Sequence, residues 1–308
     1  MGRAAQILLL VLAPVAVLAA MVAADRAFGA PGLGRDYVIR IALPPSGGEI
    51  GLPPVQGPLD ASRPLVVIDA GHGGHDPGAG MADTREKTLT LALAMALRDR
   101  LLAEGGIRVA LTRSDDHYLL LEERSGIARR LKADLFVSIH ADSTGEGVGD
   151  ASGATIYTLS ETGSSQTAER MAARENGSDT VNGVSLKGKT DAVSAILVDL
   201  SQRDTQARSN AFASVLLREA QGSIPFREHP VQSAAFVVLK SPDVPSVLFE
   251  AGYISNPAEA ARLLSAAGRD VFAQVTAQAI RVHFARISHS ELSSAAPITA
   301  PITAPGGV

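Results

Sequence analysis

The sequence predicts an α/β fold: a three-layer sandwich in which a twisted, mostly parallel sheet of about six strands is flanked by helices. Two observations lead to this prediction. Short apolar runs rich in β-branched residues alternate along the chain with longer segments whose apolar residues recur at helical spacing, and such alternation is typical of an α/β domain. Most of the short runs are continuously apolar, as expected of strands that are buried on both faces.

Six segments are predicted to be strands, and each is short, apolar and bounded by polar residues, glycine or proline. The first is "LVVIDA", residues 65–70. The others are residues 107–113, 134–140, 154–159, 235–240 and 246–251.

Three helices are predicted around the sheet. The first covers residues 86–106, where two glycines end it, and the second covers residues 119–134. The last runs from Pro257 to about Arg286. Its start is well marked because Asn256 is a favourable N-cap, Pro257 suits the first helical position and Glu259 places an acid in the first turn.

Composition excludes several classes of site. The formal net charge of -4 is distributed without a basic stripe, so nucleic acid is not an expected partner. Cysteine is absent, which excludes disulfides, thiolate nucleophiles and cysteine metal ligands. Any metal must therefore be held by histidine, aspartate or glutamate.

The first 30 residues read as a secretory signal peptide. Arg3 precedes an apolar run from Ile7 to Ala24 that ends in small residues, which is the usual layout of such a peptide. The alternative is a retained membrane anchor, since the run approaches the length of roughly 18 to 20 residues that spans a bilayer. Both interpretations predict export, and membrane contact only through this segment.

The predicted folded domain covers residues 63–287 and lies between two less regular segments. Residues 31–62 are rich in proline and glycine and read as a linker with at most one strand, "YVIRIAL" at 37–43. Residues 288–308 contain a short tandem of Ala-Pro-Ile-Thr without apolar periodicity, which predicts a disordered tail.

Polar side chains follow three of the predicted strands. His72 lies just past the first strand, His140 ends the strand at 134–140, and Glu250 lies near the end of the strand at 246–251. Glu86 opens the first helix. Ligands of α/β proteins bind where parallel strands end, so these side chains can converge. Two imidazoles and one carboxylate form a common ligand set for catalytic zinc, although other divalent ions also suit them.

Four motifs then carry a resemblance: "VVIDAGHGGHDPGA" at 66–79, "REKTLTLALA" at 85–94, "DLFVSIHADS" at 134–143 and "VPSVLFEAGYISNP" at 244–257. In this order they resemble zinc-dependent N-acetylmuramoyl-L-alanine amidases of the amidase-3 family. The resemblance implies one Zn²⁺ per chain, with His72, Glu86 and His140 as ligands and Glu250 as the catalytic base and acid. The implied substrate is peptidoglycan, cut at the amide between N-acetylmuramic acid and L-alanine.

Two other functions stay open at this point. A zinc peptidase that acts within the stem peptide would use the same ligand chemistry, and a catalytically dead module would hold peptidoglycan in the same cleft without cutting it. The other histidines, His117, His229, His283 and His289, lie outside the motifs and are expected at the surface or in ordinary packing.

The segment at about 160–222 is longer than a connection between two elements requires, and long insertions are often functional. It resembles the regulatory insertion of division-associated amidases, in which a helix covers the zinc. Glu175 in "ARENGSD" is the expected blocking residue, with Glu169 as the second candidate. The resemblance also implies a LytM-domain activator and a role at division in the periplasm of a Gram-negative-type bacterium. In the family's larger members an AMIN targeting domain precedes the enzyme; from this sequence we expect at most a remnant of it, the strand at 37–43.

Overall fold

The computed structural model describes residues 12–13, 16–17, 20–21, 51–81, 84–143, 151–181, 184–185 and 195–295. The chain divides into two units, residues 1–49 and 50–308. Most of the predicted signal peptide, the predicted strand at 37–43 and the end of the tail lie outside the described residues. In the described part of the chain, none of the helices has both the length and the apolar character needed to cross a membrane.

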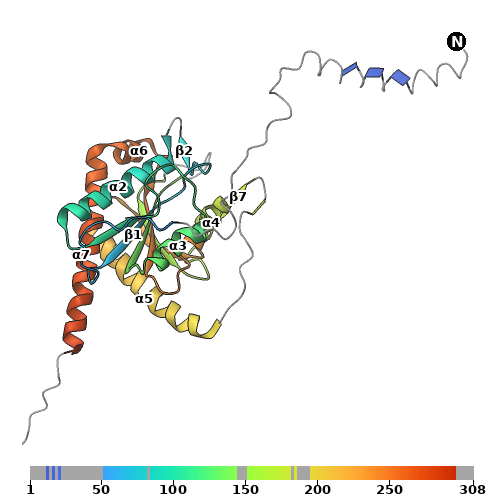
Figure 1. The fold of residues 1–308 in the computed structure, drawn as a ribbon. Helices are drawn as coiled ribbons and strands as arrows, with labels where there is room; N and C mark the ends of the chain where they lie inside the picture. Colours follow the sequence, from blue (N-terminus) through green and yellow to red (C-terminus); the bar gives the residue numbers. More distant parts are fainter. Residues whose placement is uncertain are drawn as a thin grey trace, which may run out of the picture. The chain divides into compact units, whose positions relative to one another are not determined.

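One six-stranded sheet forms the centre of the second unit (Figure 1). Its strand order is β4-β1-β5-β10-β6-β9. The first four of these run parallel, β6 is antiparallel to β10, and β9 is parallel to β6. The strands are β1 (Leu65–Ala70), β4 (Arg108–Leu111), β5 (Leu135–Asp142), β6 (Ala154–Leu159), β9 (Phe226–Ala234) and β10 (Ser246–Tyr253). The predicted mostly parallel sheet is confirmed.

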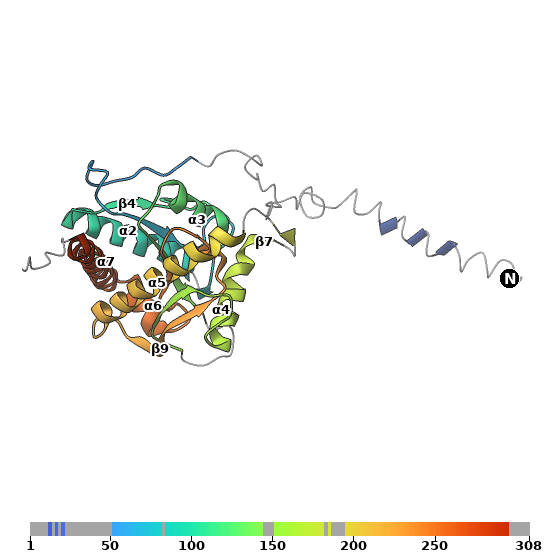
Figure 2. The same cartoon turned by 90° about the horizontal axis from the view of Figure 1, so that it is seen from below.

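Helices cover both faces of this sheet, as the predicted three-layer sandwich requires. On one face α7 packs against α2 and α5, and Figure 2 shows α5 and α7 lying side by side. On the other face lie α3, α4 and a turn of 3-10 helix, η2. The first layer contains α2 (Glu86–Glu104), α5 (Ala195–Ala220), α6 (Pro257–Leu264) and α7 (Ala266–Ala295), and the second contains α3 (Leu121–Arg130), α4 (Gln166–Asn176) and η2 (Val237–Leu239).

Three short elements complete the described structure. Two hairpins are formed by β2 (Gly80–Met81) with β3 (Thr84–Arg85) and by β7 (Thr180–Val181) with β8 (Val184–Ser185), and η1 (Gly177–Asp179) follows α4 directly.

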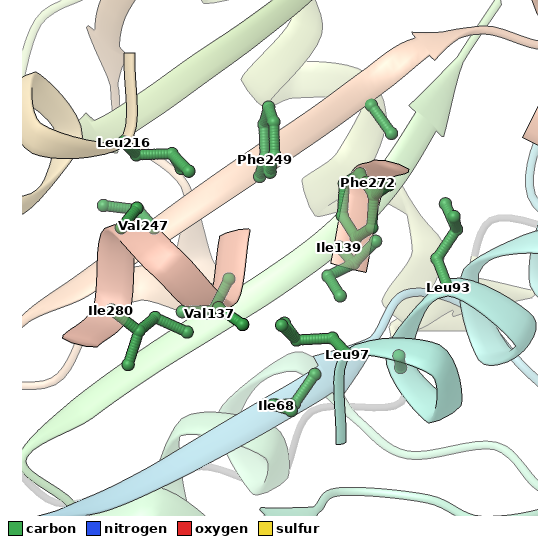
Figure 3. Packing of buried hydrophobic residues seen from close by; sticks show 14 of the residues in the cluster. Ile68, Leu93, Leu97, Val137, Ile139, Leu216, Val247, Phe249, Phe272 and Ile280 are labelled. Carbon is green, nitrogen blue, oxygen red and sulfur yellow. The ribbon is translucent and has the colours of Figure 1, made fainter. Parts of the chain in front are cut away.

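The apolar core lies in two parts because successive strand residues point to opposite faces of the sheet. Val66 and Ile68 of β1 face the larger part, under α2, α5 and α7, whereas Leu65 and Val67 face the smaller part, under α3 and α4. Figure 3 shows the larger part, in which strand residues such as Val137 pack against the helices. Each fully buried side chain of this kind stabilises the fold by about 1.5–3 kcal/mol.

The predicted strand at 235–240 is wrong. Residues 237–239 form η2, and the sixth strand is β9 at 226–234. The run at 235–240 is apolar because it is buried under α3 and α4, and a short buried run does not by itself distinguish a strand from another conformation. Strand β9 was missed because it lies at the edge of the sheet, is half-exposed and contains Pro230, so its sequence is polar.

The predicted last helix is two helices. Asn256 caps α6 as expected, accepting hydrogen bonds from the backbone of Ala258 and Glu259. The helix is interrupted at Ser265. The Ser265 hydroxyl accepts a hydrogen bond from the backbone N–H of Gly268 and so caps the start of α7. Helix α7 continues to Ala295, so residues 288–295, predicted to be tail, are helical.

The end of the predicted linker is attached to the sheet. Gln56 exchanges two backbone hydrogen bonds with Val109 of β4, at 2.8 and 2.9 Å. The Arg108 guanidinium also donates to the carbonyl oxygens of Ala61 and Arg63. These bonds cover part of the outer edge of β4.

Candidate metal centre

The carboxyl ends of β1, β5 and β10 bring the predicted site residues together. His72 follows β1, His140 lies near the end of β5, and Glu250 pairs with His140 in the register of β5 and β10. Glu86 is the first residue of α2. All four side chains are buried. Polar groups from distant parts of the chain therefore meet at one enclosed place, at the carboxyl ends of parallel strands.

The ring nitrogens of two histidines face one carboxylate. His72 Nε2 lies 3.1 Å from Glu86 Oε2, and His140 Nδ1 lies 3.3 Å from Glu86 Oε1. Within the described residues, His72 Nε2 and His140 Nδ1 have no partner that meets hydrogen-bond geometry, and both atoms are buried. Buried polar atoms usually have partners. The ligand atoms of His72, Glu86 and His140 all lie within 4.8 Å of one another, which fits a divalent cation.

Other contacts fix how these donors are oriented. Asp76 Oδ2 lies 2.7 Å from His72 Nδ1, so Asp76 leaves Nε2 as the nitrogen that faces the centre. Glu86 is anchored by both oxygens, which accept from the backbone N–H groups of Ala79 at 2.8 Å and Ala141 at 2.9 Å. Asp76 is a site residue that was not predicted from the sequence. Its signal was an acid four residues after His72 in "HGGHDPG".

Glycines make room for this arrangement. A Cβ atom on Gly71 would lie 2.5 Å from His140 Cε1, and one on Gly78 would lie 2.6 Å from His72 Cδ2. His72 itself has a φ of 60°, a left-handed conformation that costs a residue other than glycine about 1–2 kcal/mol. The glycines of "GHGGHDPGA" therefore allow the imidazole rings to lie close to the backbone.

The charges of the centre favour a cation. Burial lowers the pKa of His72, but the Glu86 and Asp76 carboxylates outweigh it and raise that pKa to about 10. For Glu86, burial raises the pKa, and His72 and His140 outweigh it and hold the pKa well below its usual range. The negative charges of these carboxylates therefore favour positive charge at the centre, either as protons on the histidines or as a bound cation.

Glu250 lies beside the three donors. It is 1% exposed, and oxygens of Glu250 and Glu175 lie within 4.8 Å of a ring nitrogen of His140. Burial lowers the pKa of His140, but the carboxylates of Glu175, Glu86 and Glu250, in this order of influence, raise it well above its usual value. Glu250 is therefore close enough to act on a group held by His140.

Helix α4 brings a further carboxylate into the centre. Glu175 Oε2 lies 3.2 Å from His140 Nδ1 and 3.5 Å from His72 Nε2. Glu175 is buried, whereas Glu169, on the same helix, is exposed. Of the two acids considered in the insertion, the structure brings only Glu175 to the site.

The remaining histidines stay away from this centre. His75 is exposed, with its ring centroid 4.1 Å from that of Tyr118. His117, His229 and His289 are exposed, and His283 is buried among phenylalanine rings. These positions agree with the expectation of surface or packing roles.

Comparisons with known proteins agree with this site. The profile of the amidase-3 family, N-acetylmuramoyl-L-alanine amidase, matches residues 66–282. N-acetylmuramoyl-L-alanine amidase AmiA of Escherichia coli K12 is 40% identical over 222 residues, which cover 71% of this chain and 76% of that protein. AmiC of Escherichia coli O6:H1 is 37% identical over 235 residues, 75% of this chain but only 56% of AmiC.

A solved structure shows that the fold is also similar to that of such an amidase. The catalytic domain of CwlV, an N-acetylmuramoyl-L-alanine amidase from Bacillus (Paenibacillus) polymyxa, superposes with a TM-score of 0.53 at 29% identity, covering 72% of this chain and 98% of that domain. The family profile covers well over half of the chain and includes His72, Glu86, His140 and Glu250. The chain therefore belongs to the amidase-3 family of N-acetylmuramoyl-L-alanine amidases.

Proposed function

We propose that this protein hydrolyses the amide between N-acetylmuramic acid and L-alanine in peptidoglycan. One observation carries the proposal: two imidazole nitrogens and the Glu86 carboxylate converge within 4.8 Å, with Glu250 paired beside His140 on the neighbouring strand. Such a set of donors with an adjacent acid suits hydrolysis of an amide, and relatives of the chain carry the name of this activity.

His72, Glu86 and His140 would hold the metal, for which we propose one Zn²⁺ per chain. Bound there, the ion would polarise the scissile carbonyl and lower the pKa of water. Asp76 keeps the His72 ring in the orientation that presents Nε2. The backbone N–H groups of Ala79 and Ala141 hold both oxygens of Glu86.

Glu250 would move the proton of the reaction. As the attacking water adds to the carbonyl carbon, the Glu250 carboxylate accepts a proton from it, and the resulting acid then protonates the nitrogen of the leaving alanine. The carbon–nitrogen bond breaks, and the products are a muramic acid carboxylate and a peptide with a free amine. The buried position of Glu250 excludes bulk water from this transfer.

The test is a digest of purified peptidoglycan by the full chain, with products identified by mass spectrometry. Stem peptides that begin with a free alanine amine are the expected products. Alanine left attached to muramic acid would indicate a peptidase instead. Binding without any release, in the presence of Zn²⁺ and even after Glu175→Ala, would indicate a binding module.

We also propose that α4 inhibits the site. Glu175 occupies the space between His72 Nε2 and His140 Nδ1, where the substrate carbonyl or the water would need to lie. The carboxyl end of α4 is attached to the rest of the domain. The Asn176 side chain bonds the backbone of Ala235 and Val237, and Asp179 accepts from the Tyr118 hydroxyl at 2.8 Å.

Activation then requires a partner that moves α4 away, and we propose a LytM-domain protein for this role. We further propose that residues 1–30 direct export, as a cleaved signal or a retained anchor, and that the enzyme acts in the periplasm of a Gram-negative-type bacterium during daughter-cell separation. A fusion of residues 1–30 to an export reporter tests the first step, since export of the reporter should depend on the apolar run from Ile7 to Ala24.

A further inference from the structure

Two arginines lie buried directly beneath the loop that carries His72. Arg113 follows β4 and is 1% exposed, and Arg124 lies on α3 and is 2% exposed. Arginine is almost never fully buried unless its charge and donors are matched. Both guanidinium groups donate hydrogen bonds to the segment between the end of β1 and His72.

Arg124 binds three points of this short segment. Its Nη1 donates to Asp69 Oδ1 at 2.9 Å and to the Ala70 carbonyl at 2.8 Å, and its Nη2 donates to the His72 carbonyl at 2.8 Å. Asp69 supplies the opposite charge, and its carboxylate is held in turn by the hydroxyls of Thr112 and Ser138. The planar guanidinium therefore fixes the segment from Asp69 to His72 as one unit.

Arg113 joins the same segment to the helix that carries Glu86. Its Nε donates to the Ala70 carbonyl at 2.9 Å, and its Nη2 donates to the carbonyls of Gly71 at 2.9 Å and Lys87 at 2.7 Å. Lys87 is the residue after Glu86. The carbonyl groups of residues 70, 71 and 72 thus all accept from a buried guanidinium.

Burial of two arginine charges is unfavourable by itself, so packing of the core does not explain why they lie here. Burial and the positive charge of Arg124 lower the pKa of Arg113 to about 10. Buried ion pairs are in general weak contributors to stability compared with apolar packing. In addition, His72 adopts a strained left-handed backbone with a φ of 60°, and its carbonyl is the one that Arg124 holds. Strain of this kind persists only where surrounding contacts enforce it.

We infer that Arg124 and Arg113 are positioning residues of the metal centre. Arg124 holds the strained backbone of His72, and Arg113 fixes the position of that loop relative to the helix that begins at Glu86. The inference rests on the proposed metal centre. It assigns to the two arginines the alignment of the His72 and Glu86 donors before any metal binds, whereas neither arginine contacts the donor atoms.

The experiment uses Co²⁺ alone as the probe and the full chain with Arg124→Lys or Arg113→Lys. Lysine keeps the charge but lacks the planar fork that spans several carbonyls. The Co²⁺ affinity, from competition with a chelator, and the visible absorption spectrum of bound Co²⁺ are measured on folded protein. We expect binding about 10- to 100-fold weaker than wild type, the usual effect of losing such support, and a changed spectrum.

Two further variants separate positioning from general loss of stability. Thr112→Val removes the hydroxyl that holds Asp69 while both arginines remain, and we expect a smaller weakening of Co²⁺ binding, about 3- to 10-fold. Thr112→Val also tests the inference if an arginine variant does not fold. Ile280→Ala opens a cavity in the core under α7, on the opposite face of the sheet, and should lower thermal stability without changing Co²⁺ affinity or spectrum.

The outcomes distinguish the inference from the proposal beneath it. Wild type that binds Co²⁺, with arginine and Thr112 variants that bind it equally tightly and with the same spectrum, would overturn the inference and leave the metal centre intact. Equal weakening by Ile280→Ala would also overturn it, because the effect would then be loss of stability. Wild type that binds no Co²⁺ would overturn the proposed centre itself, and the inference with it.

Discussion

Glu175 on α4 and His140 on β5 approach each other at the metal centre, with Glu175 Oε2 3.2 Å from His140 Nδ1. The two residues are far apart in sequence and belong to different parts of the fold, the insertion and the central sheet. If His140 holds the metal as proposed, this carboxylate lies where the substrate carbonyl or the attacking water would need to lie. The contact therefore links the position of one helix to the accessibility of the site.

Removal of the Glu175 carboxylate should raise the basal activity. In Glu175→Ala the helix loses its main interaction with the centre, so the open state becomes more populated. Coupling of this kind typically changes an equilibrium 5- to 150-fold, and we expect release of stem peptides to rise by about 10-fold or more. The measurement is the initial rate of peptide release from purified peptidoglycan without any activator.

Glu169→Ala is the matched control for this prediction, because Glu169 is an exposed acid on the same helix. It removes the same side-chain atoms without touching the centre, so its rate should equal that of wild type. Equal rates for wild type and Glu175→Ala would show that this carboxylate does not restrain the enzyme.

The attachment of α4 should also control the basal rate. Asp179 Oδ1 accepts from the Tyr118 hydroxyl and from the Leu121 backbone N–H at the start of α3. Loss of two such hydrogen bonds costs about 2 kcal/mol, so Asp179→Ala should raise the rate by up to about 30-fold and speed amide exchange in α4. Asp179→Asn keeps an acceptor oxygen and should change the rate less.

A double variant tests whether both residues act through the same helix. If Asp179 only holds α4 in place, Asp179→Ala should add little to the rate of Glu175→Ala, whose blocking carboxylate is already gone. Independent multiplication of the two effects would point to a separate action of Asp179.

Loss of the Glu250 carboxylate should slow catalysis strongly without removing the metal. Glu250→Gln keeps the shape of the side chain but not its ability to accept a proton, and general acid–base catalysis typically contributes 10²- to 10⁴-fold. We expect a decrease of that order in the Glu175→Ala background, where the starting rate is higher. Metal content should stay the same, because His72, Glu86 and His140 remain. A variant that loses metal and activity together would assign Glu250 to the ligands instead.

The sequence predicted the central strands better than β9, at one edge of the sheet. Strands β1, β5 and β10 are buried on both faces and so have continuously apolar sequences. Strand β9 is half-exposed, and its sequence resembles that of a loop. Residues 236–239 of the apolar run at 235–240 are also buried but lie outside the sheet, so their hydrophobicity indicated burial and not conformation.

The same limit applies to the site. His72, His140 and Glu250 could be predicted from their positions at strand ends together with the family motifs. Asp76 and Arg124 could not, because their roles depend on which atoms they reach: Asp76 bonds a ring nitrogen, and Arg124 bonds a carbonyl 52 residues earlier in the chain. The position of Asp76 four residues after His72 was a weak signal, whereas the contact of Arg124 follows from the folded path and leaves no spacing pattern in the sequence.

Stability should fall in mild acid because of His283 in α7. Burial lowers the pKa of His283 to about 4, and the positive charges of Arg208 and Arg286 add to this effect. The ring is 4% exposed and packs against Phe212 and Phe284. Unfolded histidine has a pKa near 6.5, so between about pH 6.5 and pH 4 the unfolded chain binds a proton that the folded chain does not. The free energy of unfolding should therefore decrease as the pH falls through this range.

His283→Phe should remove this contribution, because phenylalanine fills the same space among the rings and does not titrate. The contribution is on the order of 3 kcal/mol between pH 7.5 and pH 4, and it appears as the difference between wild type and variant in urea unfolding at the two pH values. His289→Phe, at an exposed position, should keep the wild-type dependence. A His283→Phe variant that loses as much stability in acid as wild type would show that His283 is protonated in the folded protein as readily as in the unfolded chain.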